Sequence, residues 1–440
     1  MKRVVIVGAD FAQSSLPPAL RIRYFASHLA EYGWQPTVLT SNPRHYNWSV
    51  DQENERLIPA SVNVVRTGAL PASLARKFGI GDIGMRTLIQ HWAALVRLCL
   101  RGQVDLLLIP VPPYMSMILG RLIYAQFKIP YVVDYIDPWV TNYYWKLPPD
   151  QRPPKWPLAN ALARICEPFA LRKVSAITGV SLGTTDSVRS RYPWLGPERA
   201  TEIPYGGETN DIDYVHKSQR PNLIFDRHDG QLHISYTGAI IPSMHATLRA
   251  LFEAVRLGRV RTPELFARLR MHFVGTTYAA NASSYQVLPL AQEAGVADMV
   301  DERPGRVAYL DALRILLDSH GLVVVGSDEP HYTASKIFPY ILARKPLLVV
   351  FHEASSVVSI VRETNSAALV TYSTQRPPAL AVDSIAEALE QMLREPDRPP
   401  QTGWAAFETY TTRAMASRLA TVFNRVVEQE RQPYVSSTAH

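Results

Sequence analysis

The chain has few cysteines, no long apolar segment and no strong excess of charge, and each absence excludes a class of protein. Its only cysteines are Cys99 and Cys166, too few for a disulfide framework or a multi-cysteine zinc site. We expect both to be buried, reduced thiols of a cytosolic protein. No apolar run reaches the roughly 20 residues of a membrane-spanning helix, and Val4–Val7 is too short for a signal peptide. The formal net charge is +7, far from that of a nucleic-acid-binding tail, so no nucleic acid is expected as a partner.

What is present indicates a multidomain globular protein. Hydrophobic residues make up 47% of the 440 residues and charged residues 19%, so a packed core is feasible and wholesale disorder is not. The length suggests two or three domains. The small excess of positive charge fits a protein that meets phosphates or an anionic membrane surface.

Short β-rich runs alternate with amphipathic helical stretches, which is typical of βαβ units around parallel sheets. The alternation ends near Thr201–Ile203, and it restarts at His233–Gly238 after a polar segment that contains Pro221 and Gly230. We therefore predict an α/β protein of two doubly wound, Rossmann-like halves facing a cleft. In such sheets, ligands bind outside the carboxyl ends of the strands.

One segment resembles a known family signature. Ser335-Lys336-Ile337-Phe338 with Lys345-Pro346 is similar to a Ser-Lys…Lys-Pro motif of glycosyltransferase family 4, whose members are retaining sugar-nucleotide enzymes of the GT-B fold. Five other stretches lie in the order of that family: Val104–Leu106 with Pro112-Pro113, Val133–Trp139, Ile203–Gly207, Tyr236–Gly238 and Phe273–Gly275. Six motifs in this order cover nearly the whole chain.

The resemblance implies a domain organisation and an activity. It predicts an acceptor-side domain (1–209), a linker (210–230), a nucleotide-sugar donor domain (231–404), a C-terminal helix that packs back on the first domain (405–432) and a tail (433–440). It implies a cytoplasmic hexosyltransferase of polysaccharide biosynthesis that needs neither metal nor cofactor. The partners would be a nucleotide-diphosphate sugar and a glycan, lipid-linked or small-molecule acceptor.

Three candidate catalytic residues lie in loops that follow strands. Asp137 precedes Pro138-Trp139 and is placed to orient or deprotonate an acceptor hydroxyl, or alternatively to cap a turn. Glu329 and His331 lie between a predicted strand and the Ser335 helix, where they would contact sugar hydroxyls or the developing oxocarbenium charge. An ordinary polar loop is the alternative.

The candidate donor-binding residues follow from the same logic. Ser335 would cap a helix, and Lys336 would place a positive charge beside the diphosphate; the alternative is a solvated lysine after a normal cap. The remaining candidates are phosphate-facing polar residues, cleft-lining glycines and one arginine beside the base: Ser15, Arg21, Gly238, Gly275 and Arg306.

The sequence also departs from the family pattern. The paired glutamates of its donor motif fall on His331 and Pro339, and the basic pair that clamps the diphosphate is replaced within Ile240–His245. These changes leave open a sugar-nucleotide epimerase, a pseudo-glycosyltransferase or a non-catalytic homologue on the same fold.

The segment Tyr143–Pro157 is an insertion rich in aromatic and basic residues. It suggests either a lid on the protein surface or peripheral contact with the inner face of a membrane that carries a lipid-linked acceptor. One helical stripe is expected to be core rather than a membrane anchor, and His91 beside it as well; it is formed by Leu88, Trp92, Leu95, Val96 and Cys99.

Overall fold

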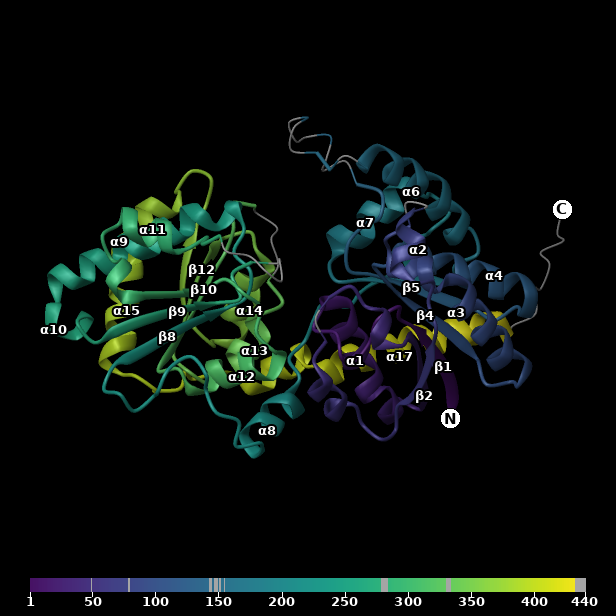
Figure 1. Cartoon of the computed structure of the whole chain (residues 1–440), viewed down its shortest axis with the longest axis horizontal. Coiled ribbons are helices and arrows are strands. Elements are labelled where there is room, and N and C mark those ends of the chain that lie inside the picture. The colour runs from purple at the N-terminus through teal and green to yellow at the C-terminus, as the bar shows by residue number, and fades with distance from the viewer. Residues whose placement is uncertain are drawn as a thin grey trace, which may run out of the picture. The chain divides into compact units, whose positions relative to one another are not determined.

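The computed structural model describes residues 1–48, 50–77, 80–141, 145, 149, 152–153, 155–277, 284–329 and 334–431. The chain folds into two compact units (Figure 1). The first unit comprises Met1–Tyr205 and the segment from Thr412 onward, and the second unit comprises Gly206–Thr411.

The first unit is built on a parallel sheet in the order β3-β2-β1-β4-β5-β6-β7. The order reverses between β1 and β4, which is the switch point of a doubly wound sheet and the place where such folds bind ligands. The strands are β1 (Lys2–Val7), β2 (Trp34–Ser41), β3 (Asn63–Thr67), β4 (Leu106–Val111), β5 (Tyr131–Tyr135), β6 (Ala176–Gly179) and β7 (Ala200–Glu202).

Helices cover both faces of this sheet. One apolar cluster joins the sheet to α1 and α17, and another joins its opposite side chains to α3, α4, α6 and α7. The helices are α1 (Pro17–His28), α2 (Ala72–Lys77), α3 (Ile83–Leu100), α4 (Met117–Phe127), α6 (Trp156–Leu171), α7 (Leu182–Arg191) and α17 (Thr412–Arg431). Because both faces are covered, β1, β4 and β5 are almost wholly apolar and buried, as expected for parallel strands.

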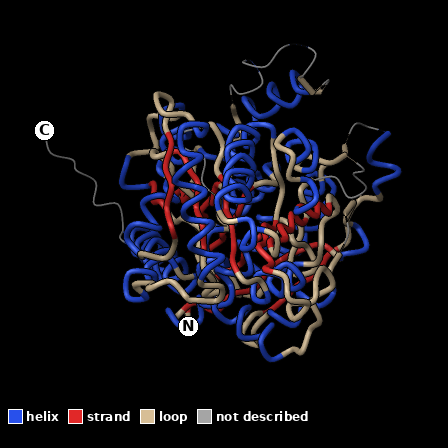
Figure 2. Tube along the Cα trace, turned by 90° about the vertical axis from the view of Figure 1, so that its left-hand side faces the viewer, coloured by secondary structure: helices blue, strands red, loops and turns tan. Residues whose placement is uncertain are grey.

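The second unit repeats the architecture with six parallel strands in the order β10-β9-β8-β11-β12-β13. They are β8 (Leu232–Thr237), β9 (Leu269–Val274), β10 (Val300–Arg303), β11 (Gly321–Val325), β12 (Leu347–His352) and β13 (Ala368–Tyr372). Figure 2 shows strands, in red, lying between blue helices. The helices are α8 (Thr209–Lys217), α9 (His245–Arg261), α10 (Pro263–Phe266), α11 (Leu288–Glu293), α12 (Tyr309–Asp318), α13 (Ile337–Leu342), α14 (Ser356–Thr364), α15 (Val382–Arg394) and α16 (Trp404–Phe407).

The prediction of two parallel α/β units is confirmed, but the polar segment 210–230 is not a plain linker. Its first part lies within α8, which belongs to the second unit. Glu208 caps the helix by accepting the amide of Asn210 at 3.1 Å, and Ile212 and Val215 bury one face. A nine-residue helix with two apolar anchors gives too weak a periodic signal to stand out from its polar neighbours.

The chain passes between the units twice, and the two passages run side by side. The amide of Gly207 donates to Tyr410 O at 2.8 Å, and Gly207 forms a parallel bridge with Thr411. A Cβ on Gly206 would come within 2.6 Å of the carbonyl carbon of Thr411, so the passage requires glycine. None of the helices in the described ranges is both long and apolar enough to cross a bilayer.

Candidate functional site

The carboxyl edge of the second sheet is shaped by two glycines. Gly238 follows β8 and Gly275 follows β9, with φ of 124° and 74°, which only glycine adopts readily. The amide of Gly238 donates to Val274 O at 2.8 Å, and Gly238 N lies 3.9 Å from the position of a Cβ on Gly275. The two turns are therefore adjacent, and they leave bare backbone where side chains would stand.

Lys336 points into this same place. A Cβ on Gly238 would be 2.7 Å from Lys336 Nζ, so the ammonium lies directly over the turn. It donates to the hydroxyl of the buried Tyr236 and stands 4.2 Å from the centre of that ring. Sequence reasoning missed Tyr236 because its ring reads as an ordinary strand residue.

The electrostatics of Lys336 are unusual. Within the part of the chain that the structure describes, its ammonium forms no ion pair with a carboxylate. Desolvation lowers its pKa from 10.5 to about 7, because burial disfavours the charged form. An anion placed over Gly238 would supply the missing counter-charge.

The role predicted for Ser335 as a helix cap is wrong. The helix α13 begins at Ile337, its N-cap is Lys336, and no side chain bonds its first amides. Ile337 N donates instead to Ala334 O at 3.1 Å, and Phe338 N to Ser335 O at 3.4 Å. Backbone carbonyls therefore close the first turn, and the exposed Ser335 hydroxyl is not used as the cap. Whether Ser335 contacts a donor stays a prediction.

The other predicted residues of this unit lie around the same edge. Arg306 is exposed, and its Cα lies 3.9 Å from the Cβ position of Gly275. Glu329 is also exposed, and its amide donates to Ser327 Oγ at 3.2 Å in the loop after β11. His331 lies outside the described residues. The structure thus brings Gly238, Gly275 and Lys336 together, with Arg306 beside them.

A buried carboxylate that sequence reasoning missed fixes the loop after β9. Glu302 in β10 accepts Thr276 Oγ1 at 2.6 Å and the amides of Gln286, Val287 and Leu288 at 2.8, 2.9 and 2.7 Å. Three amides and a hydroxyl saturate its oxygens. Glu302 is therefore a positioning residue for the loop that follows Gly275.

In the first unit, Arg21 is held by a buried ion pair. Its Nε and Nη2 donate to the two oxygens of Asp134 at 2.6 and 2.8 Å, and Nη2 also donates to Ile203 O at 2.7 Å. Thr178 donates to Asp134 at 2.6 Å, and both charged side chains are inaccessible to solvent. The positive charge of Arg21, which was expected to face a phosphate, is thus balanced by Asp134. The pair links α1 and β5, and the bond to Ile203 ties both to the end of this unit's first segment.

The carboxyl edge of the first sheet instead holds buried polar atoms without hydrogen-bond partners among the described residues. They include Asp10 Oδ2 after β1, Thr40 Oγ1 in β2 and Ser116 Oγ after β4. Desolvation raises the pKa of Asp10 to about 6, and Ser14 partly offsets this. Asp82 also acts electrostatically on Asp10, and Oδ1 of Asp82 and Oγ of Ser116 lie 3.0 and 3.3 Å from the Cβ position of Gly84.

His91 extends this cluster inward. It is fully buried, as expected, next to the backbone of Thr40, and neither ring nitrogen forms a hydrogen bond of good geometry in the described chain. Desolvation lowers its pKa to about 4, so the ring is neutral at physiological pH. Sequence reasoning missed Asp10, Thr40 and Ser116 because small polar residues after strands are common turn formers.

The last two predicted residues of the first unit lie at the same edge. Asp137 lies on the surface just after β5, and partial desolvation of its carboxyl raises its pKa above the ordinary value. Ser15 is half-buried and accepts a hydrogen bond from Asn54 Nδ2 at 3.2 Å. Asp137 remains accessible to an acceptor, whereas the hydroxyl of Ser15 already has a protein partner.

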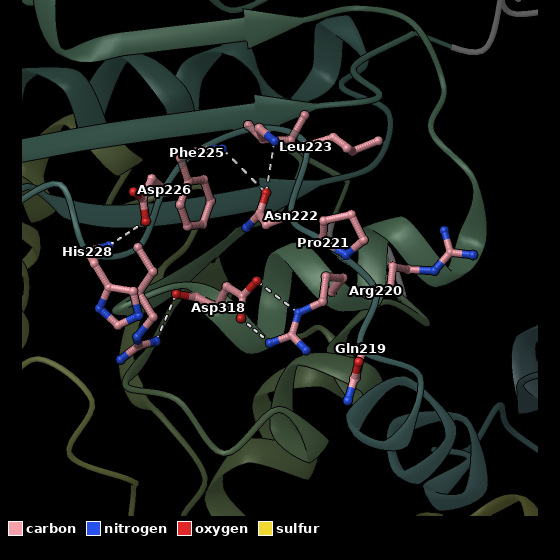
Figure 3. Close-up of a pocket in the computed structure, with 12 residues that line it drawn as sticks. Gln219, Arg220, Pro221, Asn222, Leu223, Phe225, Asp226, His228 and Asp318 are labelled. Atoms are coloured by element: carbon pink, nitrogen blue, oxygen red, sulfur yellow. Dashed lines mark hydrogen bonds and ion pairs between the residues drawn. The ribbon is translucent and has the colours of Figure 1, made fainter.

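A cavity of about 650 Å³ lies elsewhere in the second unit, between residues 219–228 and α12 (Figure 3). The segment precedes β8 and Asp318 precedes β11, so this cavity is at the amino edge of the sheet. Its arginines are already engaged: Arg314 pairs with Asp318, and Arg227 donates to Asp318 O at 2.8 Å. We therefore assign no substrate to it.

Two doubly wound parallel units with ligand edges of this kind define the GT-B fold. Residues 18–206 match the family model of the glycosyl transferase 4-like domain. The resemblance to glycosyltransferases of this type is therefore confirmed over these residues of the first unit. No curated protein matches the chain in sequence.

Solved structures share the fold over nearly the whole chain. HepE from Anabaena, in complex with UDP and glucose, matches at a TM-score of 0.61 and 13% identity over 97% of this chain and 100% of its own. A UDP-forming trehalose-phosphate synthase from Burkholderia xenovorans, in complex with glucose-6-phosphate, matches at 0.62 and 12% over 96% and 100%. A Listeria monocytogenes protein assigned as a UDP-N-acetylglucosamine 2-epimerase matches at 0.52 and 11% over 98% of both chains.

Proposed function

We propose that the protein is a metal-independent, retaining hexosyltransferase that moves a sugar from a nucleotide-diphosphate donor to a glycan, lipid-linked or small-molecule acceptor. The observation that carries the proposal is the Lys336 ammonium over Gly238, without a carboxylate partner in the described residues. The glycosyl transferase 4-like domain in residues 18–206 supports the same class of reaction.

The chemistry needs positive charge where the leaving diphosphate collects negative charge. As the bond between the sugar and the diphosphate breaks, the diphosphate gains an electron pair, and a fixed cation stabilises it. Lys336 is placed for this role because Gly238 and Gly275 allow phosphate oxygens to approach the backbone. Arg306, exposed beside Gly275, can extend toward the nucleotide.

The acceptor side is proposed for the first unit. Asp10, Thr40 and Ser116 keep buried polar atoms unsatisfied at the edge where doubly wound sheets bind ligands. The hydroxyls of a sugar would satisfy such atoms. Asp137, exposed at the same edge, is the group proposed to orient the reacting hydroxyl.

A uridine nucleotide is the first donor to test. HepE binds UDP, and the trehalose-phosphate synthases are UDP-forming. Titration calorimetry of the full chain should show UDP binding that Lys336→Met weakens. The matched control is Lys345→Met, because Lys345 precedes β12 at the amino edge and pairs with Asp397 at 2.8 Å. If neither UDP nor GDP binds, the proposal fails.

An epimerase on the same fold is the second candidate. Pro339 stands where the family places a ribose-binding glutamate, and the Listeria relative shares the fold. Incubation of labelled UDP-sugars without acceptor separates the two: an interconverted sugar favours the epimerase, and hydrolysis or transfer favours the transferase. A non-catalytic homologue would show no turnover with any donor.

We further propose that the protein works in the cytoplasm at a membrane surface. The insertion expected to carry this contact, Tyr143–Pro157, lies mostly outside the described residues.

A further inference from the structure

Three neighbouring helices of the first unit form a continuous outer layer. α3, α4 and α6 pack on the same face of the sheet, and α4 contacts both of the others. In Figure 1, α6 lies at the top of the first unit, and α3 and α4 lie toward its right-hand side. Their solvent-facing side chains are called here the α3–α4–α6 surface.

This surface exposes large apolar side chains at helical spacing. On α6 they are Leu158, Ile165 and Phe169, exposed by 74%, 70% and 47%. Positions seven and eleven residues apart lie on one face of a helix, so these three side chains form a stripe. α3 contributes a second stripe: Ile89, Trp92 and Leu100.

The second stripe corrects an expectation. The α3 side chains Leu88, Trp92 and Leu95 were all expected in the core, but only Leu95 among them is fully buried, and Trp92 is exposed. Helix α3 is apolar on more of its circumference than its packing against the sheet requires. Contiguous exposed apolar side chains, especially with a polar rim, are typical of an interaction surface.

The charge on this surface is predominantly positive. The sole acidic residue within the three helices is Glu167, which is inaccessible and bonded to Arg191, Tyr135 and Tyr192. Exposed basic residues lie on the helices or directly beside them: Arg97, Arg101, Lys128, Lys155, Arg164, Arg172 and Lys173. On the same count, among the described residues, the one exposed acid directly beside a helix is Asp82, the N-cap of α3. Arg121 in α4 is half-buried and stands 5.7 Å from the ring centre of Phe169.

We propose that the α3–α4–α6 surface docks on a bilayer of anionic phospholipids, with the apolar stripes in the interface and the basic residues among the headgroups. Apolar side chains with a basic rim, and no exposed acid within the three helices themselves, match such a surface. A second copy of the chain is the poorer occupant, because a two-fold interface would bring two basic rims together. This specifies the membrane contact within the proposed function, but it does not depend on sugar transfer.

Co-sedimentation with vesicles tests the proposal. The full chain should bind phosphatidylcholine vesicles that contain 30% phosphatidylglycerol and should bind pure phosphatidylcholine vesicles far less. Neutralising Arg164 and Arg172 with glutamine should weaken binding about 25-fold, at roughly fivefold for each charge. Leu158→Ser with Ile165→Ser should weaken it about 100-fold, at about tenfold or more for each buried side chain.

Matched controls come from α9 in the second unit. Arg249→Gln with Arg256→Gln removes two exposed charges, and Val260→Ser removes a side chain that is 72% exposed. These variants should bind vesicles as the unmodified protein does. Thermal unfolding checks that every variant is folded.

Three results would overturn the proposal. The first is equal binding to neutral and anionic vesicles, and the second is unchanged binding by the α6 variants. The third is a dimer, seen by light scattering, that the α6 variants dissociate, because the surface would then be an interface between copies. Since the α6 variants should bind UDP normally, a chain that binds vesicles but no UDP would contradict the proposed transferase alone.

Discussion

Replacing Lys336 with methionine should weaken nucleotide binding and, at the same time, make the protein more stable. Methionine keeps the length of the side chain and removes the charge. The Tyr236 hydroxyl, which Lys336 contacts, still donates to Ala239 O at 3.0 Å. The substitution therefore leaves the buried Tyr236 hydroxyl with a hydrogen-bond partner.

The sign and size follow from the pKa. A lysine whose pKa falls from 10.5 to about 7 on folding carries a cost that is complete below pH 7. That cost fades as pH rises toward 10.5, because the unfolded state binds more protons in this window. The full shift corresponds to about 5 kcal/mol at 1.36 kcal/mol per unit. Because part of the side chain is exposed, we expect about 1–2 kcal/mol of added stability in Lys336→Met at pH 6.

Two measurements check this prediction. Urea unfolding at pH 6 and pH 10 should show a gain in the free energy of unfolding at pH 6 that shrinks at pH 10. Calorimetry should show UDP affinity lowered about 10- to 100-fold, the size of one lost hydrogen bond to a charged group. The affinity of the unmodified protein should also fall above pH 7, and that of the variant should not. A variant that is less stable at pH 6 and binds UDP normally would refute the reasoning.

Three further substitutions test other parts of the structure. Arg21→Met should cost about 3–5 kcal/mol by urea unfolding, because it leaves the Asp134 carboxylate buried and unpaired; a loss below 1 kcal/mol would mean that Asp134 is solvated. Gly206→Ala should lower the melting temperature in calorimetry, because its Cβ would meet a carbonyl carbon at 2.6 Å, whereas Gly68→Ala, with open space around it, should not. Asp10→Asn should stabilise the protein at pH 8 but not at pH 3.5: burial raises its pKa from 3.8 to about 6, so the cost of ionisation appears between these values and is complete above pH 6. Equal stability changes at the two pH values would contradict the last prediction.

The sequence was informative where geometry follows from topology. In parallel sheets, every strand ends at the same edge, so the residues after β8, β9 and β11 had to meet. Gly238, Gly275 and Lys336 do so, although their loops are up to 98 residues apart by number. The same rule predicts two doubly wound units from the alternation of apolar runs.

What the sequence could not predict is which charges find partners. Arg21 and Asp134 are 113 residues apart, and nothing local indicates that their side chains bond in the core. The short helix α8 was also not predicted. Its sequence is typical of a linker, and it is the burial of Ile212 and Val215 in the folded unit that stabilises the helix. The partner that a single side chain contacts depends on tertiary packing, which the periodicity of the sequence does not determine.

The two units share one feature that fold stability alone does not explain. Each places an ionisable group just beyond the first strand of its sheet: Asp10 after β1, and Lys336 over Gly238 after β8. Desolvation shifts both pKa values toward the neutral form, to about 6 and about 7. The structure also contains the stabilised alternative, the buried pair of Arg21 and Asp134, so this fold can accommodate a compensated charge where only stability is at stake. Groups that remain uncompensated at the two ligand edges, within the described chain, are therefore the groups for which a bound substrate is the expected partner.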